Sequence, residues 1–218
     1  LLGLPRNPAD YTGTLTHRKF PFVLIDHQGG GTPCMAVGAT NWQGAYQATE
    51  YLIKLGHKRI GFITGWKDLG AATDRLAGYK SALRTYHLSE DPQLIYEGTF
   101  ARLDGYAGAS ALIDIDNPPT AFFASNDDMA MGVMDAVHNR GLRIPEDISI
   151  VGFDDIPQAA LVRPALTTVR QPLEQMGGVA TQMLIDLIQN PEKRIERIEL
   201  PTELIVRDST STSKDKAG

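Results

Sequence analysis

The sequence contains a single cysteine and no long uninterrupted hydrophobic stretch. One cysteine, Cys34, excludes a disulfide within the chain and fits a reducing compartment. No apolar run approaches the roughly 20 residues of a membrane span, and no signal peptide is visible at the start. The formal net charge of −5 argues against a chain that grips nucleic acid unaided. We therefore expect a cytoplasmic protein with no membrane segment.

Motifs for catalysis, phosphate binding and metal binding are absent too. There is no G-x-S-x-G, G-x-x-x-x-G-K-[ST], H-E-x-x-H or C-x-x-C pattern. The five histidines are scattered, and His57 is interpreted as a solvated loop residue just past a helix end. The Asp127-Asp128 and Asp154-Asp155 pairs could mimic a metal or glycosidase pair, but the simpler interpretation is that one residue of each caps a helix or faces solvent. The sequence thus predicts no enzyme, no metal and no cofactor.

What is present is an alternation of strand and helix signals in 218 residues of ordinary globular composition. This alternation predicts an α/β fold with parallel strands. The serine- and threonine-rich tail from Ser209 onward is expected to be disordered. We expect strands over 20–26, 59–64, 94–96, 120–125, 148–153, 166–169 and 198–206, and helices over 41–55, 72–86, 103–115, 127–139 and 174–189.

Three short apolar runs end on a carboxylate or a carboxamide, at Asp26, Asn126 and Asp154. Their nearly continuous hydrophobicity is typical of strands buried on both faces of a parallel sheet. Ligands of open α/β sheets sit beyond the carboxyl ends of the strands, so we expect these three side chains to converge. Such acceptors and donors suit a neutral, hydroxyl-rich ligand.

Six motifs, in order along the chain, resemble the effector-binding core of the lactose/galactose repressor family. The resemblance runs from about residue 20 to residue 210. The motifs are Leu-Gly-His-Lys-Arg-Ile-Gly at 55–61, Arg-Leu-Ala-Gly-Tyr at 75–79, Asn-Asp-Asp-Met-Ala-Met-Gly at 126–132, Gly-Leu-Arg-Ile-Pro-Glu-Asp-Ile-Ser-Ile-Val-Gly-Phe-Asp-Asp at 141–155, Leu-Thr-Thr-Val-Arg-Gln-Pro at 166–172 and Leu-Pro-Thr-Glu-Leu-Ile-Val-Arg at 200–207.

The resemblance implies a periplasmic-binding-protein-like fold of two Rossmann-like lobes with parallel sheets and three crossovers, near Ala39, Gln171 and Leu200. The chain opens on Leu-Leu-Gly-Leu without methionine, and we expect an N-terminal portion of lobe one, a helix-turn-helix headpiece and a hinge helix to be missing. The implied lobe boundaries are 1–39 with 172–200 for lobe one, 40–171 with 201–211 for lobe two, and 212–218 for a disordered tail.

The family's effector contacts map onto six residues of this sequence. They are Asp26, Arg75, Phe100, Asn126, Asp154 and Gln171. The guanidinium of Arg75 suits two vicinal hydroxyls or a carboxylate, and its alternative reading is a surface helix arginine. Phe100 suits stacking on a sugar ring, and its alternative is a hydrophobic lid residue. The family has an acidic residue where this chain has Thr40, which leaves a contact from Thr40 open.

The implied function is that of a ligand-sensing domain of a transcriptional repressor. It would bind a small polar effector, a sugar, between its lobes and transmit lobe closure to the missing headpiece, through which alone operator DNA would be bound. A homodimer is expected from the resemblance and from the apolar run at 160–162. One alternative is a periplasmic sugar-binding protein of a transport system, against which stand the lack of a visible signal peptide and the run at 166–172. Another is a sugar-processing hydrolase, which would need a matched acid and base that the sequence does not identify.

Overall fold

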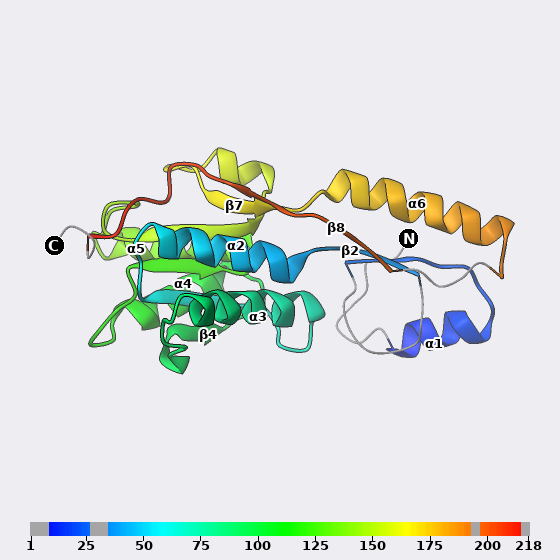
Figure 1. The fold of residues 1–218 in the computed structure, drawn as a ribbon, viewed down its shortest axis with the longest axis horizontal. Coiled ribbons are helices and arrows are strands. Elements are labelled where there is room, and N and C mark those ends of the chain that lie inside the picture. The colour runs from blue at the N-terminus through cyan, green and yellow to red at the C-terminus, as the bar shows by residue number, and fades with distance from the viewer. Residues whose placement is uncertain (1–8, 27–34, 193–196, 215–218) are drawn as a thin grey trace.

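The computed structural model describes residues 9–26, 35–192 and 197–214, and it places two sheets side by side along the long axis of the molecule (Figure 1). The smaller sheet has the parallel order β1-β2-β8. The larger has the order β4-β3-β5-β6-β7-β9, parallel except for the antiparallel pairing of β7 with β9. Their bounds are β1 Leu24–Ile25, β2 Ala36–Ala39, β3 Ile60–Thr64, β4 Ile95–Glu97, β5 Ala121–Ala124, β6 Ser149–Asp154, β7 Thr167–Arg170, β8 Arg197–Leu200 and β9 Glu203–Ile205.

Two pairs of helices cover the two faces of the larger sheet. Because side chains alternate along a strand, Phe62 of β3 joins the core beneath α2 and α3, while Ile63 joins the core beneath α4 and α5. Both faces are therefore buried, which explains why the strands read as continuous apolar runs. The four helices are α2 (Asn41–Lys54), α3 (Gly70–Thr85), α4 (Arg102–Ile113) and α5 (Asp127–Asn139).

The smaller sheet has one helix of the described chain on each face. Met176 and Ala180 of α6 (Leu173–Gln189) pack with Val37 of β2. On the other face, Leu15 of α1 (Ala9–His17) packs against Leu24 of β1. Each sheet thus has apolar cores of its own.

The chain passes between the two sheets three times. It leaves β2 for α2, returns from β7 to α6, and passes again from β8 to β9. The first and third passages touch: the Thr202 N–H donates to Thr40 Oγ1 (3.0 Å), and the two hydroxyls are 3.1 Å apart. This two-lobed α/β architecture with three crossovers is the fold class predicted from the sequence.

Several elements differ from the sequence prediction. The expected strand over 20–26 shrinks to β1, and α1 and β2 were not predicted at all. Three threonines and a glycine give α1 a weak helix signal, and small residues give β2 a weak strand signal. The expected strand over 198–206 is two strands in different sheets, interrupted at Pro201, which has no N–H to donate. Leu1 to Leu4 and Cys34 lie outside the described residues.

The expectation of a disordered tail is wrong for residues 209–214, because His57 and its neighbours hold this segment. His57 is only 3% exposed, so it is not the solvated loop residue we predicted. Its Nε2 lies 3.1 Å from the carbonyl of Ser211, and its Nδ1 lies 2.9 Å from Thr120 Oγ1. Ser213 is buried as well and donates its N–H to the carbonyl of Leu55. Residues 215–218 lie outside the described part of the chain.

No helix within the described ranges is both long enough and apolar enough to cross a membrane.

Candidate ligand-binding site

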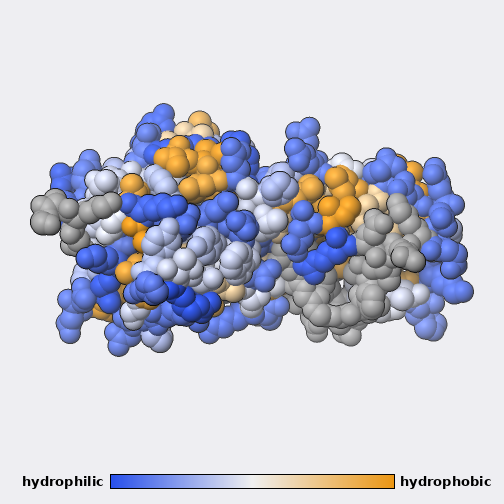
Figure 2. Space-filling model, viewed as in Figure 1, coloured by the Kyte–Doolittle hydropathy of each residue, from blue (hydrophilic) through white to orange (hydrophobic). Residues whose placement is uncertain are grey.

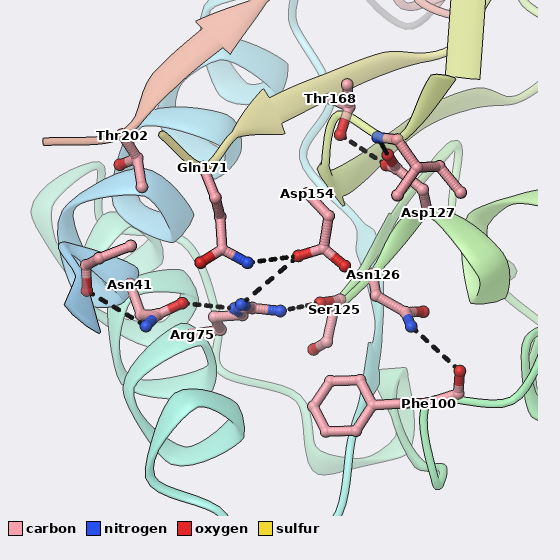
Figure 3. A network of polar contacts seen from close by, with 12 residues as sticks. Asn41, Arg75, Phe100, Ser125, Asn126, Asp127, Asp154, Thr168, Gln171 and Thr202 are labelled. Atoms are coloured by element: carbon pink, nitrogen blue, oxygen red, sulfur yellow. Dashed lines mark hydrogen bonds and ion pairs between the residues drawn. The ribbon is translucent and has the colours of Figure 1, made fainter. Parts of the chain in front are cut away.

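A buried arginine on α3 lies at the centre of a polar cluster at the carboxyl ends of β5 and β6 (Figure 3). Arg75 is 3% exposed, and its Nε donates to Asn41 Oδ1 at 2.7 Å. Its Nη1 donates to the carbonyl of Ser125, and its Nη2 lies 3.6 Å from Asp154 Oδ1. The guanidinium carbon is 3.8 Å from the centre of the Phe153 ring, within reach of a cation–π interaction. Arg75 is therefore not a surface helix arginine, and its alternative reading is excluded.

Asp154 is the last residue of β6 and faces Arg75. Its backbone has φ +116°, a conformation that L residues rarely adopt and that is often found at functional sites. Its side chain keeps 24% of its surface exposed, and Oδ1 accepts a 2.7 Å hydrogen bond from Gln171 Nε2. Burial raises the pKa of Asp154, and Arg75 and Gln171 oppose that rise. The carboxylate thus has protein partners on Oδ1 and stays open to solvent in part.

Two buried polar atoms of this cluster have no hydrogen-bond partner among the residues that the structure describes. They are Ser125 Oγ and Gln171 Oε1. Ser125 is fully buried and Gln171 is 7% exposed. An unmet buried donor or acceptor costs about 1–3 kcal/mol, so such atoms are uncommon unless something else satisfies them. Both belong to residues in the cluster around Arg75 and Asp154 (Figure 3).

Asp26 approaches the same cluster from the smaller sheet. It follows β1 directly, has φ +56°, and is exposed. Burial lowers the pKa of Arg75, and the negative charges of Asp154 and Asp26 oppose that change. The charge of Asp26 also helps to raise the pKa of Asp154. Asp26 and Asp154 thus both act electrostatically on Arg75, and the convergence of Asp26, Asn126 and Asp154 on one ligand stays a prediction.

Asn126 and Phe100 form one wall of the cluster and bind each other. Asn126 Oδ1 accepts from the Met129 N–H at 2.9 Å, which caps α5, and its Nδ2 donates to the carbonyl of Phe100 at 3.0 Å. Phe100 has φ +69°, and its ring lies so close to Gly65 that a Cβ there would be 2.1 Å from a ring carbon. Asn126 thus spends one donor and one acceptor on the protein and retains one of each for other partners.

Asn126 rather than Asp127 caps α5, and Asp128 faces solvent, which is the second of the two alternatives expected for this pair. Asp127 is fully buried, and its Oδ2 accepts from the Ile156 N–H at 2.9 Å while Oδ1 accepts from the Thr168 hydroxyl. Burial raises the pKa of Asp127 to about 7, although these two hydrogen bonds oppose the rise. The side chain joins α5 to β7 and to the loop that follows Asp154, so it helps to hold that loop in place.

Asp155 neither caps a helix nor faces solvent. Its side chain is 8% exposed and forms ion pairs with Arg207 (2.6 Å) and Arg170 (2.7 Å). Burial acts to raise the pKa of Asp155, but the hydrogen bonds from the two arginines outweigh it and hold the pKa below its usual value. The carboxylates of Asp127 and Asp155 are therefore both bound by other residues of the protein. Neither forms an acid pair with another carboxylate of the described chain.

No group of three or more His, Cys, Asp or Glu residues in the described chain could hold a metal ion. Sequence reasoning missed Asn41, Ser125 and the Thr40–Thr202 pair. Thr40 precedes α2, and Asn41 is the first residue of that helix. No local pattern could identify these residues, since their partners lie 34 to 162 positions away along the chain.

Two α/β lobes joined by three crossings, with a polar cluster at strand ends where they meet, define a ligand-binding domain of the periplasmic-binding-protein-like class. A family model described as "Periplasmic binding protein-like domain" matches residues 49–210. Within that class, the solved structures and relatives below show that the chain belongs to the LacI family of transcriptional regulators, the lactose/galactose repressor family that its motifs resemble.

Three of these relatives illustrate the match. The chain is 35% identical over 195 residues to the probable HTH-type transcriptional repressor ExuR of Bacillus subtilis. The aligned region covers 89% of this chain and 59% of that protein. It is 32% identical, with a TM-score of 0.86, to a LacI family transcriptional regulator from Enterococcus faecium with bound ribose, covering 93% of this chain and 75% of that one. It is 34% identical, with a TM-score of 0.87, to the transcriptional regulator CelR in complex with cellobiose, covering 91% of this chain and 61% of that one. The chain thus spans about three fifths of the length of the curated relatives it matches.

Replacement of Asp127 by asparagine should remove a pH dependence of stability. A carboxyl group whose pKa is raised from 3.8 to about 7 on folding stabilises the protein fully below about pH 4 and loses that contribution as pH rises through 7. Asparagine keeps the neutral form, and the Thr168 hydroxyl can accept from its amide. In urea titrations between pH 4.5 and 7.5, Asp127→Asn should gain about 2–4 kcal/mol relative to the parent at the upper end.

The matched control is Asp128→Asn, because Asp128 is the neighbouring residue of α5 and is exposed. This variant should retain the parent's slope of unfolding free energy against pH. Equal slopes for Asp127→Asn and the parent would show that Asp127 is ionised throughout this range.

Proposed function

We propose that this chain is the ligand-sensing domain of a transcriptional repressor and that it binds a small neutral sugar at the Arg75–Asp154 cluster. The observation that carries the proposal is the buried Arg75, held by Asn41 and Ser125 with its Nη2 directed at a partly exposed Asp154. A fixed donor beside a fixed acceptor suits vicinal hydroxyls, each of which both donates and accepts. The ribose and cellobiose bound to two relatives support the same ligand class.

The charges of the cluster favour a neutral ligand over an anion. The single positive charge of Arg75 faces the carboxylates of Asp154 and Asp26, and the carboxyl group of Asp127 acts on it as well. An anionic sugar would meet a site with no net positive charge, whereas a hydroxyl can donate to Asp154 and to the unmet Gln171 Oε1. Phe100 and Asn126 would contact the remaining face of the sugar, which completes the set of six proposed contacts.

The proposed lobes are residues 1–39 with 172–200 and residues 40–171 with 201–211. A sugar that binds both lobes favours a closed arrangement, and the difference in affinity between open and closed states is the signal. Operator DNA would be bound by parts of the protein outside this chain, as the HTH-type name of the Bacillus subtilis relative suggests. A protein with that role works in the cytoplasm, where the DNA is.

Two other functions fit less well. A transport-system binding protein shares the fold, but the relatives reported above are transcriptional regulators. A hydrolase would need a free acid and base, and Asp127 and Asp155 are instead engaged by Thr168, Ile156 and two arginines. We therefore favour sensing over catalysis.

A thermal-shift screen tests the ligand class. Neutral sugars, with D-ribose and cellobiose among them, should include at least one that raises the melting temperature, while glucuronate and ribose 5-phosphate should not. A ligand at about 100 times its dissociation constant adds about 2.7 kcal/mol of stability. Since each kcal/mol moves the midpoint by about 2–4 °C at this size, a shift of several degrees is expected. A site that responds to the anionic sugars alone would contradict the charge argument.

Asp154→Ala should weaken binding of the sugar found in that screen by about one to two powers of ten. Hydrogen bonds to a charged group contribute about 1.5–3 kcal/mol, and 1.4 kcal/mol corresponds to tenfold. Calorimetry measures the change, and Asp116→Ala serves as control because Asp116 is an exposed aspartate of the α4–β5 connection. Unchanged affinity in a folded Asp154→Ala protein would mean that the sugar binds elsewhere.

We also propose that the chain forms a homodimer through the apolar surface at residues 160–162. Figure 2 shows apolar residues gathered over this segment, and Leu161 is 72% exposed. A surface of this kind pairs with its own copy in a two-fold dimer. Leu161→Glu should shift the sedimentation coefficient from dimer to monomer, while Leu103→Glu, at a leucine of α4 that is 79% exposed, should not. A parent chain that sediments as a monomer at high concentration would refute this interface.

A further inference from the structure

Arg75 is connected by buried hydrogen bonds to the first crossing between the lobes. The carboxamide of Asn41 accepts from Arg75 Nε at 2.7 Å through Oδ1 and donates to the carbonyl of Ala39 at 3.2 Å through Nδ2. Asn41 is 1% exposed, so no solvent can replace either bond. The planar carboxamide of Asn41 thus fixes the guanidinium of Arg75 relative to the backbone at the end of β2.

The other two crossings join the same set of contacts. Gln171, at the second crossing, donates to Asp154, and Asp154 faces Arg75 Nη2. At the third crossing, the Thr202 N–H donates to Thr40 Oγ1 and the Thr202 hydroxyl donates to the Thr40 carbonyl at 3.3 Å. Thr40 immediately precedes Asn41, so all three crossings are linked to Arg75 through at most two residues.

A change in the angle between the lobes must alter the hydrogen bonds around Asn41. Rotation about the crossings moves Ala39 relative to α3, and the Asn41 carboxamide is rigid between its two partners. Either the guanidinium turns with the crossing, or one of two buried hydrogen bonds breaks. The backbone of α2 at Gly44 packs closely against the third crossing. A Cβ at Gly44 would lie 2.7 Å from Thr202 Oγ1 and 2.9 Å from Val169 Cγ1.

We propose that Asn41 is a positioning residue that couples the orientation of Arg75 to the angle between the lobes, with the Thr40–Thr202 pair as the connection to the third crossing. Asn41 acts through Arg75 and need not touch the ligand. The proposal rests on the proposed function only in that Arg75 faces the sugar. The coupling of Asn41 to the lobe angle is a property of the ligand-free protein as well.

The two bonds of Asn41 can be separated by substitution. Asn41→Asp keeps an acceptor for Arg75 Nε and loses the donor to the Ala39 carbonyl. Thr202→Val keeps the size of the side chain and its backbone N–H bond, and removes the hydroxyl that bonds to Thr40. The matched control is Asn139→Asp, the same chemical change at an exposed residue at the end of α5.

Interlobe distances measured by electron paramagnetic resonance test the proposal in the full chain. Spin labels at Thr181→Cys on α6 and Ala107→Cys on α4, both exposed, report on the two lobes in a Cys34→Ser background. The parent and Asn139→Asp should share one narrow distribution without ligand, and D-ribose or the sugar from the screen should shift it. Asn41→Asp and Thr202→Val should broaden the ligand-free distribution and lose most of the sugar-induced shift.

The outcomes separate this proposal from the proposed function. Ligand-free distributions of Asn41→Asp and Thr202→Val that equal the parent's would overturn the coupling, whether or not a sugar binds. A broadened ligand-free distribution supports it even if none of the tested sugars binds, in which case the proposed ligand class alone is contradicted. Should circular dichroism show that Asn41→Asp does not fold, Thr202→Val decides by the same measurement, and an unchanged distribution there overturns the proposal.

Discussion

The structure of the candidate site depends on one buried cation. Arg75 lies at 3% exposure beneath the ends of β5 and β6, where an unpaired charge would be strongly destabilising. It is tolerated because the guanidinium has four partners: Asn41 and the Ser125 carbonyl accept from it, Asp154 supplies the opposing charge, and the Phe153 ring lies against one face. Removal of any of these partners leaves a charge with too few contacts, so their positions are mutually constrained.

The aspartates near this cation differ in role because their surroundings differ. Asp154 keeps an exposed fraction of 24% and faces Arg75, so it can exchange protein partners for a ligand. Asp127 is fully buried on neutral partners, and burial moves its pKa to about 7. Asp155 is held between two arginines, which lower its pKa. The three carboxylates thus separate into one that faces Arg75 and solvent, one that joins α5 to β7 and one that forms ion pairs with two arginines.

The crossings between the lobes share residues with the polar cluster around Arg75. The Thr40–Thr202 contacts join two passages of chain that are 162 positions apart, and Asn41 extends this junction to Arg75. Each lobe has apolar cores of its own, and the hydrogen bonds at the crossings join the two lobes. The coupling proposed above assigns these buried hydrogen bonds a share in setting the angle between the lobes.

The sequence by itself determined the order of the strands and helices of the larger lobe, the parallel sheet and the strand ends at which Asp26, Asn126 and Asp154 stand. These follow from local periodicity and from the position of a polar residue after an apolar run, which neighbouring residues set. Only the tertiary structure decided that Asp127 bonds to Thr168 and that Asn41 holds Arg75. These contacts join residues distant in the chain, whereas the Asn126 cap of α5 is a local contact with Met129. The short, weakly marked α1 and β2 likewise take their form from packing against the rest of the smaller lobe. Burial raised the pKa of Asp127 and Asp154, and two arginines lowered that of Asp155, and no local pattern reports either effect.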